Sequence, residues 1–120
     1  MKRSVALLLA AGVLSACNPF AADPKVAILG RWESPTWTRG QRPLFAQFKP
    51  DGKIEFMDAM ATTMYAEWLF LQSGELQITY PAGFSRRCKA TIAGSSLTIE
   101  PPKCLYGWDD VGPSIALVKQ

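Results

Sequence analysis

Leu44-Phe45-Ala46-Gln47-Phe48-Lys49-Pro50-Asp51-Gly52-Lys53-Ile54-Glu55-Phe56-Met57 is the segment that decides the fold of this chain. Its centre, Lys49-Pro50-Asp51-Gly52, is a tight-turn sequence in which the glycine supplies a positive φ angle. In the arm that follows, Ile54 and Phe56 alternate with charged residues, which is the pattern of a strand with one buried face and one wet face. The segment therefore predicts an antiparallel β-hairpin.

Similar strand patterns continue on both sides of this hairpin. Two further hairpins are predicted, with arms at residues 65–71 and 75–80 and at residues 84–92 and 96–100. The arm at 65–71 is apolar on both faces, which predicts a strand covered on both sides. Other patterns predict strands at 26–33 and 114–119, a polar loop at 34–42 and a helical turn at 58–64. About eight short strands joined by compact turns predict an all-β antiparallel meander that forms a small closed or partly open barrel.

Two short motifs in this strand order resemble those of small lipocalin-like bacterial lipoproteins. The first is Leu29-Gly30-Arg31-Trp32, and the second is Phe48-Lys49-Pro50-Asp51-Gly52. The resemblance implies a lipocalin-like β domain over residues 26–120, with Trp32 packed in the core at the closed end of the barrel. The chain length suits one such domain. The two motifs do not identify a ligand.

The N-terminal segment is typical of an export signal. Lys2 and Arg3 precede an uncharged, mostly apolar run from residue 5 to residue 14, which is too short to span a bilayer. The run ends in Leu14-Ser15-Ala16-Cys17, which resembles the lipobox of bacterial lipoproteins. This resemblance implies that residues 1–16 are a cleaved signal peptide and that Cys17 carries the lipid. An ordinary secretory signal that leaves Cys17 as a spare thiol is the alternative.

The residue after Cys17 bears on localisation. In bacterial lipoproteins an Asp at this place often directs retention in the inner membrane, and here Asn18 occupies it. The resemblance thus implies an outer-membrane lipoprotein that faces the periplasm of a Gram-negative cell. Residues 17–25 then form the lipidated cysteine and a short tether. Because eight extended residues reach only about 25 to 30 Å, the domain is expected to lie close to the membrane surface.

The remaining cysteines, Cys88 and Cys104, are expected to form a disulfide. With Cys17 lipidated they are the two left to pair, and the periplasm is oxidising. A metal site or a redox pair is the alternative, but the chain has no CxxC spacing and no histidine. We therefore expect no metal.

Charge and composition exclude several function classes. The precursor has 13 Lys and Arg against 10 Asp and Glu, and removal of Lys2 and Arg3 leaves 11 against 10, a net charge of about +1. Because of this nearly neutral balance and the export signal, we expect the protein to have no nucleic-acid partner. Without histidine, a Gly-rich phosphate loop or a nucleophile elbow, the chain is not expected to be an enzyme or to hold a cofactor. Trp108-Asp109-Asp110 is interpreted as a turn.

A binding surface is predicted in the polar segment, where Trp37, Arg39 and Arg42 place an aromatic ring beside two guanidinium groups. A Trp37 folded back over the sheet is the alternative. Arg86 and Arg87 are interpreted as residues of a solvated strand edge.

These observations favour a membrane-anchored, non-catalytic binding module for an envelope protein or a cell-wall component. One alternative is a carrier of a small apolar ligand inside the barrel, and another is a periplasmic inhibitor or immunity lipoprotein. The interior volume discriminates between a module and a carrier, because bulky side chains can fill a small barrel completely. The candidates for filling it are Trp32, Trp68, Phe45, Phe48, Phe56 and Phe70.

Overall fold

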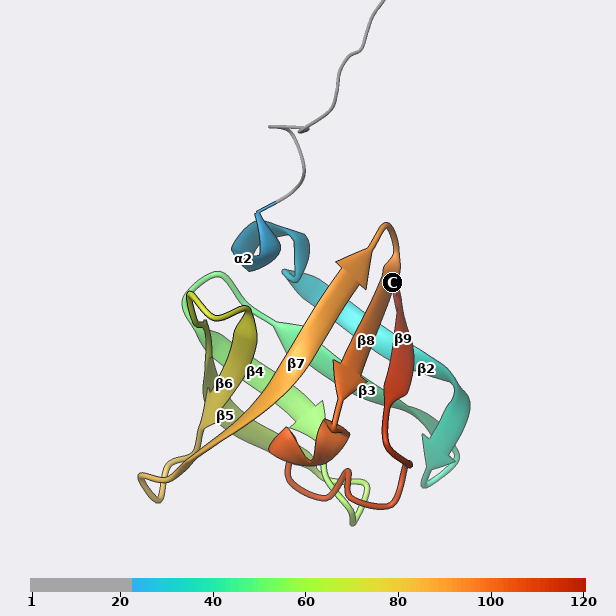
Figure 1. Ribbon diagram of the computed structural model, residues 1–120. Coiled ribbons are helices and arrows are strands. Elements are labelled where there is room, and N and C mark those ends of the chain that lie inside the picture. The colour runs from blue at the N-terminus through green and yellow to red at the C-terminus, as the bar shows by residue number, and fades with distance from the viewer. Residues whose placement is uncertain (1–22) are drawn as a thin grey trace, which may run out of the picture.

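A computed structural model describes residues 23–120, and within them eight antiparallel strands form a closed barrel in simple meander order (Figure 1). The last strand closes the barrel by pairing with the first, through Trp32 opposite Lys119. The predicted all-β meander is therefore confirmed, and the barrel is closed. The elements are α2 (Pro24–Ala27), β2 (Gly30–Arg39), β3 (Arg42–Phe48), β4 (Lys53–Met57), β5 (Thr63–Phe70), β6 (Glu75–Thr79), β7 (Ser85–Ala93), β8 (Ser96–Glu100), the 3-10 helix η1 (Pro102–Cys104) and β9 (Ile115–Lys119).

The predicted signal peptide, the predicted lipidation site Cys17 and the first part of the tether lie outside the described residues. None of the helices within residues 23–120 is long and apolar enough to cross a membrane.

The meander gives the barrel two distinct ends. The helix end carries α2, the turns at 49–52, 71–74 and 94–95, and the C-terminus. The loop end carries the turn at 40–41 and the longer connections at 58–62, 80–84 and 101–114. In Figure 1 the helix end is at the top and the loop end at the bottom, so the described chain enters the barrel at one end and has its longest loops at the other.

The hairpin predicted from residues 44–57 is present as β3 and β4. Ala46 lies opposite Phe56 and Phe48 opposite Ile54, so apolar side chains share the inner face. Gly52 has the positive φ angle that the turn requires, at 84°.

Large side chains fill the barrel interior. Trp32, Phe48 and Phe56 are almost completely buried, and so is Trp108 from the connection at 101–114. The indole N–H of Trp32 donates to the Ile28 carbonyl at 2.7 Å, near the helix end. The indole N–H of Trp108 donates to the Met57 carbonyl at 2.6 Å, near the loop end. Each of the two tryptophans therefore closes one end of the barrel while its indole N–H is hydrogen-bonded. The predicted core position of Trp32 is confirmed.

The strand predicted at residues 26–33 is wrong in its first half. Asp23 caps a short helix by accepting a hydrogen bond from the Lys25 amide at 3.0 Å, and Pro24 occupies the first turn. Both are helix-start signals, since proline needs no amide partner there. The strand begins only at Gly30, whose φ angle is 114°.

The polar loop predicted at 34–42 is instead a strand with a wide bulge, a two-residue turn and the start of the next strand. Glu33 lies opposite Phe45 and Thr38 opposite Pro43, so four residues of β2 face the single residue Leu44 of β3. The Ser34 hydroxyl oxygen accepts hydrogen bonds from two amides within this bulge, a local arrangement that competes with the ladder.

Two other local predictions are corrected by the structure. The helical turn predicted at 58–64 is absent, and residues 58–62 form a non-helical turn instead. The Asp58 carboxylate stabilises this turn by accepting hydrogen bonds from the Met60 and Thr62 amides. β5 is covered on one side only, since Tyr65 and Leu69 on its outer face are 62% and 51% exposed. A barrel has a single interior, so apolar residues on the outer face of a strand remain in solvent.

Candidate binding surface at the loop end

The connection at 101–114 closes the loop end of the barrel. Its side chains Cys104, Leu105, Trp108 and Val111 are buried, which draws this connection into the core. The predicted disulfide between Cys88 and Cys104 is present, with 5.5 Å between the two Cα atoms, and it joins β7 to η1. The connection is thus a packed part of the domain.

Tyr80 holds the same connection from inside. Its phenol donates to the Cys104 carbonyl and accepts from the Tyr106 amide, whose nitrogen is 2.9 Å away. Burial raises the pKa of Tyr80 to about 12, although the hydrogen bond from the Tyr106 amide acts in the opposite direction. The phenol therefore stays protonated and keeps both hydrogen bonds at neutral pH.

Arg39, one of the three predicted binding residues, braces the loop end. Its guanidinium donates to the Asp58 carbonyl at 3.1 Å and to the Gly107 carbonyl at 2.8 Å, and it forms an ion pair with Asp110. The side chain is only 11% exposed. Arg39 thus connects β2 to the connections at 58–62 and 101–114 and positions the surface they form.

Trp37 and Arg42 lie at the same end but make fewer contacts. The Trp37 amide donates to the Ser34 hydroxyl oxygen at 2.8 Å, while 37% of the residue remains exposed. Arg42 donates to the Ala61 carbonyl at 2.7 Å from an exposed position. The structure therefore places all three predicted residues on one hairpin at the loop end, with the guanidinium of Arg39 the most enclosed.

A second group at the loop end was missed by sequence reasoning. The guanidinium of Arg86 lies 5.6 Å from the ring centroids of both Phe84 and Tyr106, within the range of a cation–π contact. Its Nη1 atom also donates to the Lys103 carbonyl at 3.1 Å. From sequence patterns Arg86 was predicted to lie on a solvated strand edge. Tyr106 comes close to it only because the chain folds back after β8, and local patterns do not show that. The pairing of Cys88 with Cys104 was the one signal that linked the two segments.

Aromatic, sulfur and cationic side chains that are exposed or half-buried therefore lie at this end of the barrel, together with the carboxylates of Asp109 and Asp110. A cleft of about 460 Å³ between the connections at 58–62 and 101–114 is lined in part by Arg86, Tyr106 and Asp109. Beside it, Met60 is 82% exposed. We call these groups together the loop-end surface, which consists of Trp37, Arg42, Met60, Phe84, Arg86 and Tyr106.

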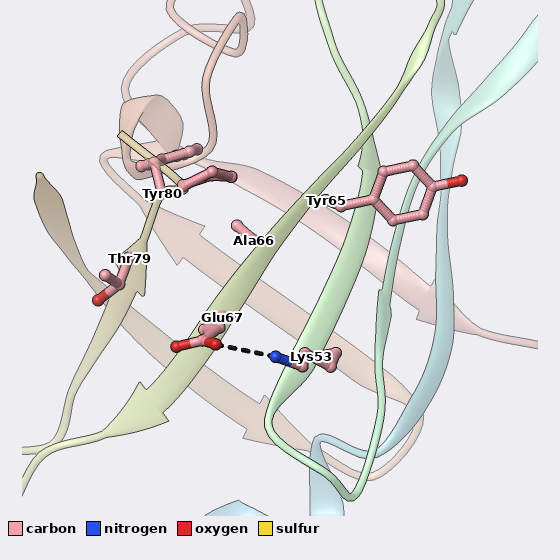
Figure 2. A pocket seen from close by; sticks show the side chains of 7 residues that line it. Lys53, Tyr65, Ala66, Glu67, Thr79 and Tyr80 are labelled. Atoms are coloured by element: carbon pink, nitrogen blue, oxygen red, sulfur yellow. Dashed lines mark hydrogen bonds and ion pairs between the residues drawn. The ribbon is translucent and has the colours of Figure 1, made fainter. Parts of the chain in front are cut away.

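A larger cleft, of about 510 Å³, lies at the seam between β5 and β6 (Figure 2). The ladder between these strands runs as far as Glu67 and Thr79. Continuing the register places Tyr65 opposite Pro81, whose nitrogen has no hydrogen to donate. The strands diverge there, and the Lys53–Glu67 ion pair, at 2.8 Å, stands on the rim of the gap. Pro81 thus lies where the pairing of β5 with β6 has ended, on the lining of the cleft.

Within residues 23–120, no group of three or more metal-ligating side chains comes together. The loop end instead carries aromatic rings and guanidinium groups, which are residue types enriched among the anchors of protein interfaces.

No protein-family model matches this chain, and no curated protein matches it.

Proposed function

We propose that this protein is a membrane-anchored, non-catalytic binding module that contacts an envelope protein or a cell-wall component through its loop-end surface. The observation that carries the proposal is that a buried contact holds the backbone from which an exposed ring projects. Tyr106 is 46% exposed, yet its amide is fixed by Tyr80. A backbone that is already ordered loses little entropy on binding, which suits the aromatic and arginine side chains that it carries to be anchors of an interface.

The filled interior supports an outer binding surface over an internal one. Trp32 and Trp108 close opposite ends, and Phe48 and Phe56 pack between them. An internal carrier site for a small ligand needs a cavity of a few hundred Å³. The clefts described above lie on the outside of the barrel and open to solvent. A carrier function is therefore the less favoured alternative.

The place where the described chain begins supports the assignment of the binding surface to the loop end. Residues 23–29 lie at the helix end, opposite the loop-end surface. If Cys17 carries the lipid, as the lipobox resemblance implies, the loop-end surface faces away from the membrane and toward the periplasm. A periplasmic inhibitor or immunity lipoprotein is the special case in which the partner is an enzyme.

The experiment is crosslinking and affinity purification of the lipidated protein from intact cells, with mass spectrometry of bound proteins, cell-wall fragments and extracted small molecules. We expect a stoichiometric macromolecular partner that is lost in the Trp37→Ala and Arg86→Ala variants. Arg87→Ala is the matched control, because Arg87 is an exposed arginine on the same strand that hydrogen-bonds to Gln77 instead. A stoichiometric apolar compound without a macromolecular partner would overturn the proposal in favour of the carrier.

A further inference from the structure

We propose that the helix end is a second membrane contact, in which an apolar groove between α2 and β5 rests in the headgroup region of the lipid bilayer. This inference depends on the lipid anchor of the proposed function. It adds a direct contact between the barrel and the membrane, which assigns the helix end to the bilayer and leaves the loop end free.

The groove has the composition of a membrane-facing surface. It has a volume of about 370 Å³ and is lined by Val26 and Leu29 from the chain start and by Trp68 and Leu69 from β5. Val26 is 63% exposed and Leu69 is 51% exposed, so two aliphatic side chains of this groove stand in solvent. Burial of such side chains in a lipid boundary is favourable in proportion to the apolar area removed from water.

The length of the tether argues for the bilayer as the occupant. From Cys17 to Asp23 there are six residue steps, which span at most about 20 Å when fully extended. Gly30 and Arg39 of β2 lie opposite Phe48 and Arg42 of β3, so the barrel wall is six residue steps of β3 long, or about 20 Å at about 3.3 Å per residue. The tether starts at the helix end and reaches no farther than the length of this wall, so the helix end is the end that it holds against the membrane.

Two polar groups on the groove suit a headgroup layer. The indole N–H of Trp68 donates to the Lys49 carbonyl at 3.0 Å, which fixes a half-buried ring on the groove wall. Tryptophan is favoured at the boundary between lipid and water because its ring is apolar and its N–H is polar. Lys25 lines the same groove and is exposed, so its ammonium group can reach lipid phosphates while its stem stays on the apolar surface.

Trp68 makes the proposal measurable by fluorescence. The lipidated protein is reconstituted into vesicles of phosphatidylethanolamine and phosphatidylglycerol, with or without bromine atoms on the acyl chains near the glycerol. We expect bromine to quench the tryptophan emission of the wild-type protein, and the Val26→Ser/Leu69→Ser variant to lose at least half of that quenching while it still floats with the vesicles. Met60→Ser is the control, because it removes a comparably exposed apolar side chain at the loop end and is expected to leave the quenching unchanged.

The outcomes separate this inference from the proposed function. If the wild-type protein floats with the vesicles but shows no quenching, or if the double variant is quenched as strongly as the wild type, the membrane contact of the helix end is overturned and the anchor stands. If the wild-type protein does not float and Cys17→Ser behaves in the same way, the anchor and the membrane contact are both overturned.

Discussion

The phenol of Tyr80 and the amide of Tyr106 are hydrogen-bonded at 2.9 Å across 26 residues of sequence. Tyr80 directly follows β6, while Tyr106 belongs to the connection that closes the loop end. The same phenol donates to the Cys104 carbonyl, so one side chain satisfies two main-chain groups of that connection. The shape of the loop-end surface therefore depends on a residue that is itself buried.

The Tyr80→Phe variant is expected to lose stability. It leaves the Cys104 carbonyl and the Tyr106 amide without their partner, at a cost of about 1 to 3 kcal/mol in the free energy of unfolding. Urea denaturation followed by tryptophan fluorescence measures this loss. Tyr65→Phe removes an exposed hydroxyl and is expected to change stability by less than about 0.5 kcal/mol. Equal losses in the two variants would contradict the role of Tyr80.

Tyr80 also gives the protein an alkaline pH dependence. Its pKa is about 12 in the folded protein against an ordinary value of 10.0, so the unfolded chain releases this proton first. The contribution of the protonated Tyr80 phenol to the free energy of unfolding is fully present below about pH 10, and it is lost as the pH rises from about 10 to about 12. Over this pH range the free energy of unfolding is expected to fall by about 2 to 3 kcal/mol. Urea denaturation at several pH values is expected to show a shallower decline for Tyr80→Phe, and identical slopes would refute the assignment.

The disulfide is expected to stabilise the domain by closing a loop of 16 residues. A loop of that size is worth about 3 kcal/mol in the chain-entropy account. The Cys88→Ala/Cys104→Ala variant should therefore unfold at a lower urea concentration, as should the wild-type protein after reduction. If reduction leaves the unfolding midpoint unchanged, the bond does not contribute to stability.

Gly107 is expected to tolerate no side chain. A Cβ atom at this position would lie 2.4 Å from the Ala59 amide nitrogen, and the φ angle is 88°. Gly74 provides a matched control, since its φ angle is 90° and a Cβ atom there meets nothing within 4 Å. Both alanine variants share the backbone strain, but Gly107→Ala should cost about 1 to 3 kcal/mol more because the two connections must separate. Equal thermal midpoints for the two variants would contradict this contact.

Arg39 and Arg42 are expected to respond differently to substitution. Arg39→Ala leaves the Gly107 carbonyl without its donor and leaves the Asp58 carbonyl only the hydrogen bond from the Ala61 amide at 3.2 Å, which should cost about 1 to 3 kcal/mol. Arg42→Ala removes one exposed hydrogen bond and should cost less than about 1 kcal/mol. Thermal unfolding of both variants checks the contrast, and a larger loss for Arg42→Ala would reverse the roles assigned to them.

Features encoded by neighbouring residues were predictable from the sequence. The hairpin at 44–57 combines a turn sequence with alternating burial, so its register follows from local pattern alone. The short helix α2 was missed although Asp23 and Pro24 are ordinary start signals for a helix, because both lie within the segment that was predicted to be a tether, residues 17–25. The bulge at Trp37 depends on hydrogen bonds to the Ser34 hydroxyl oxygen, which compete with ladder pairing and leave no periodic signal.

The candidate site was only partly predictable for a related reason. Trp37, Arg39 and Arg42 are close in sequence, so they could be recognised as a group. The contacts of Arg86 with Tyr106, and of Arg39 with Gly107, join residues that are 20 and 68 positions apart. Such contacts depend on the return path of the chain after β8, which composition and periodicity do not encode.

The most direct test of the account is photocrosslinking in intact cells from one position at each end of the barrel. A photoreactive phenylalanine analogue replaces Trp37 at the loop end in one variant and Leu69 at the helix end in another. The account predicts that position 37 captures one protein or cell-wall fragment, while position 69 captures phospholipid. Capture of the macromolecular partner from position 69 and not from position 37 would contradict it.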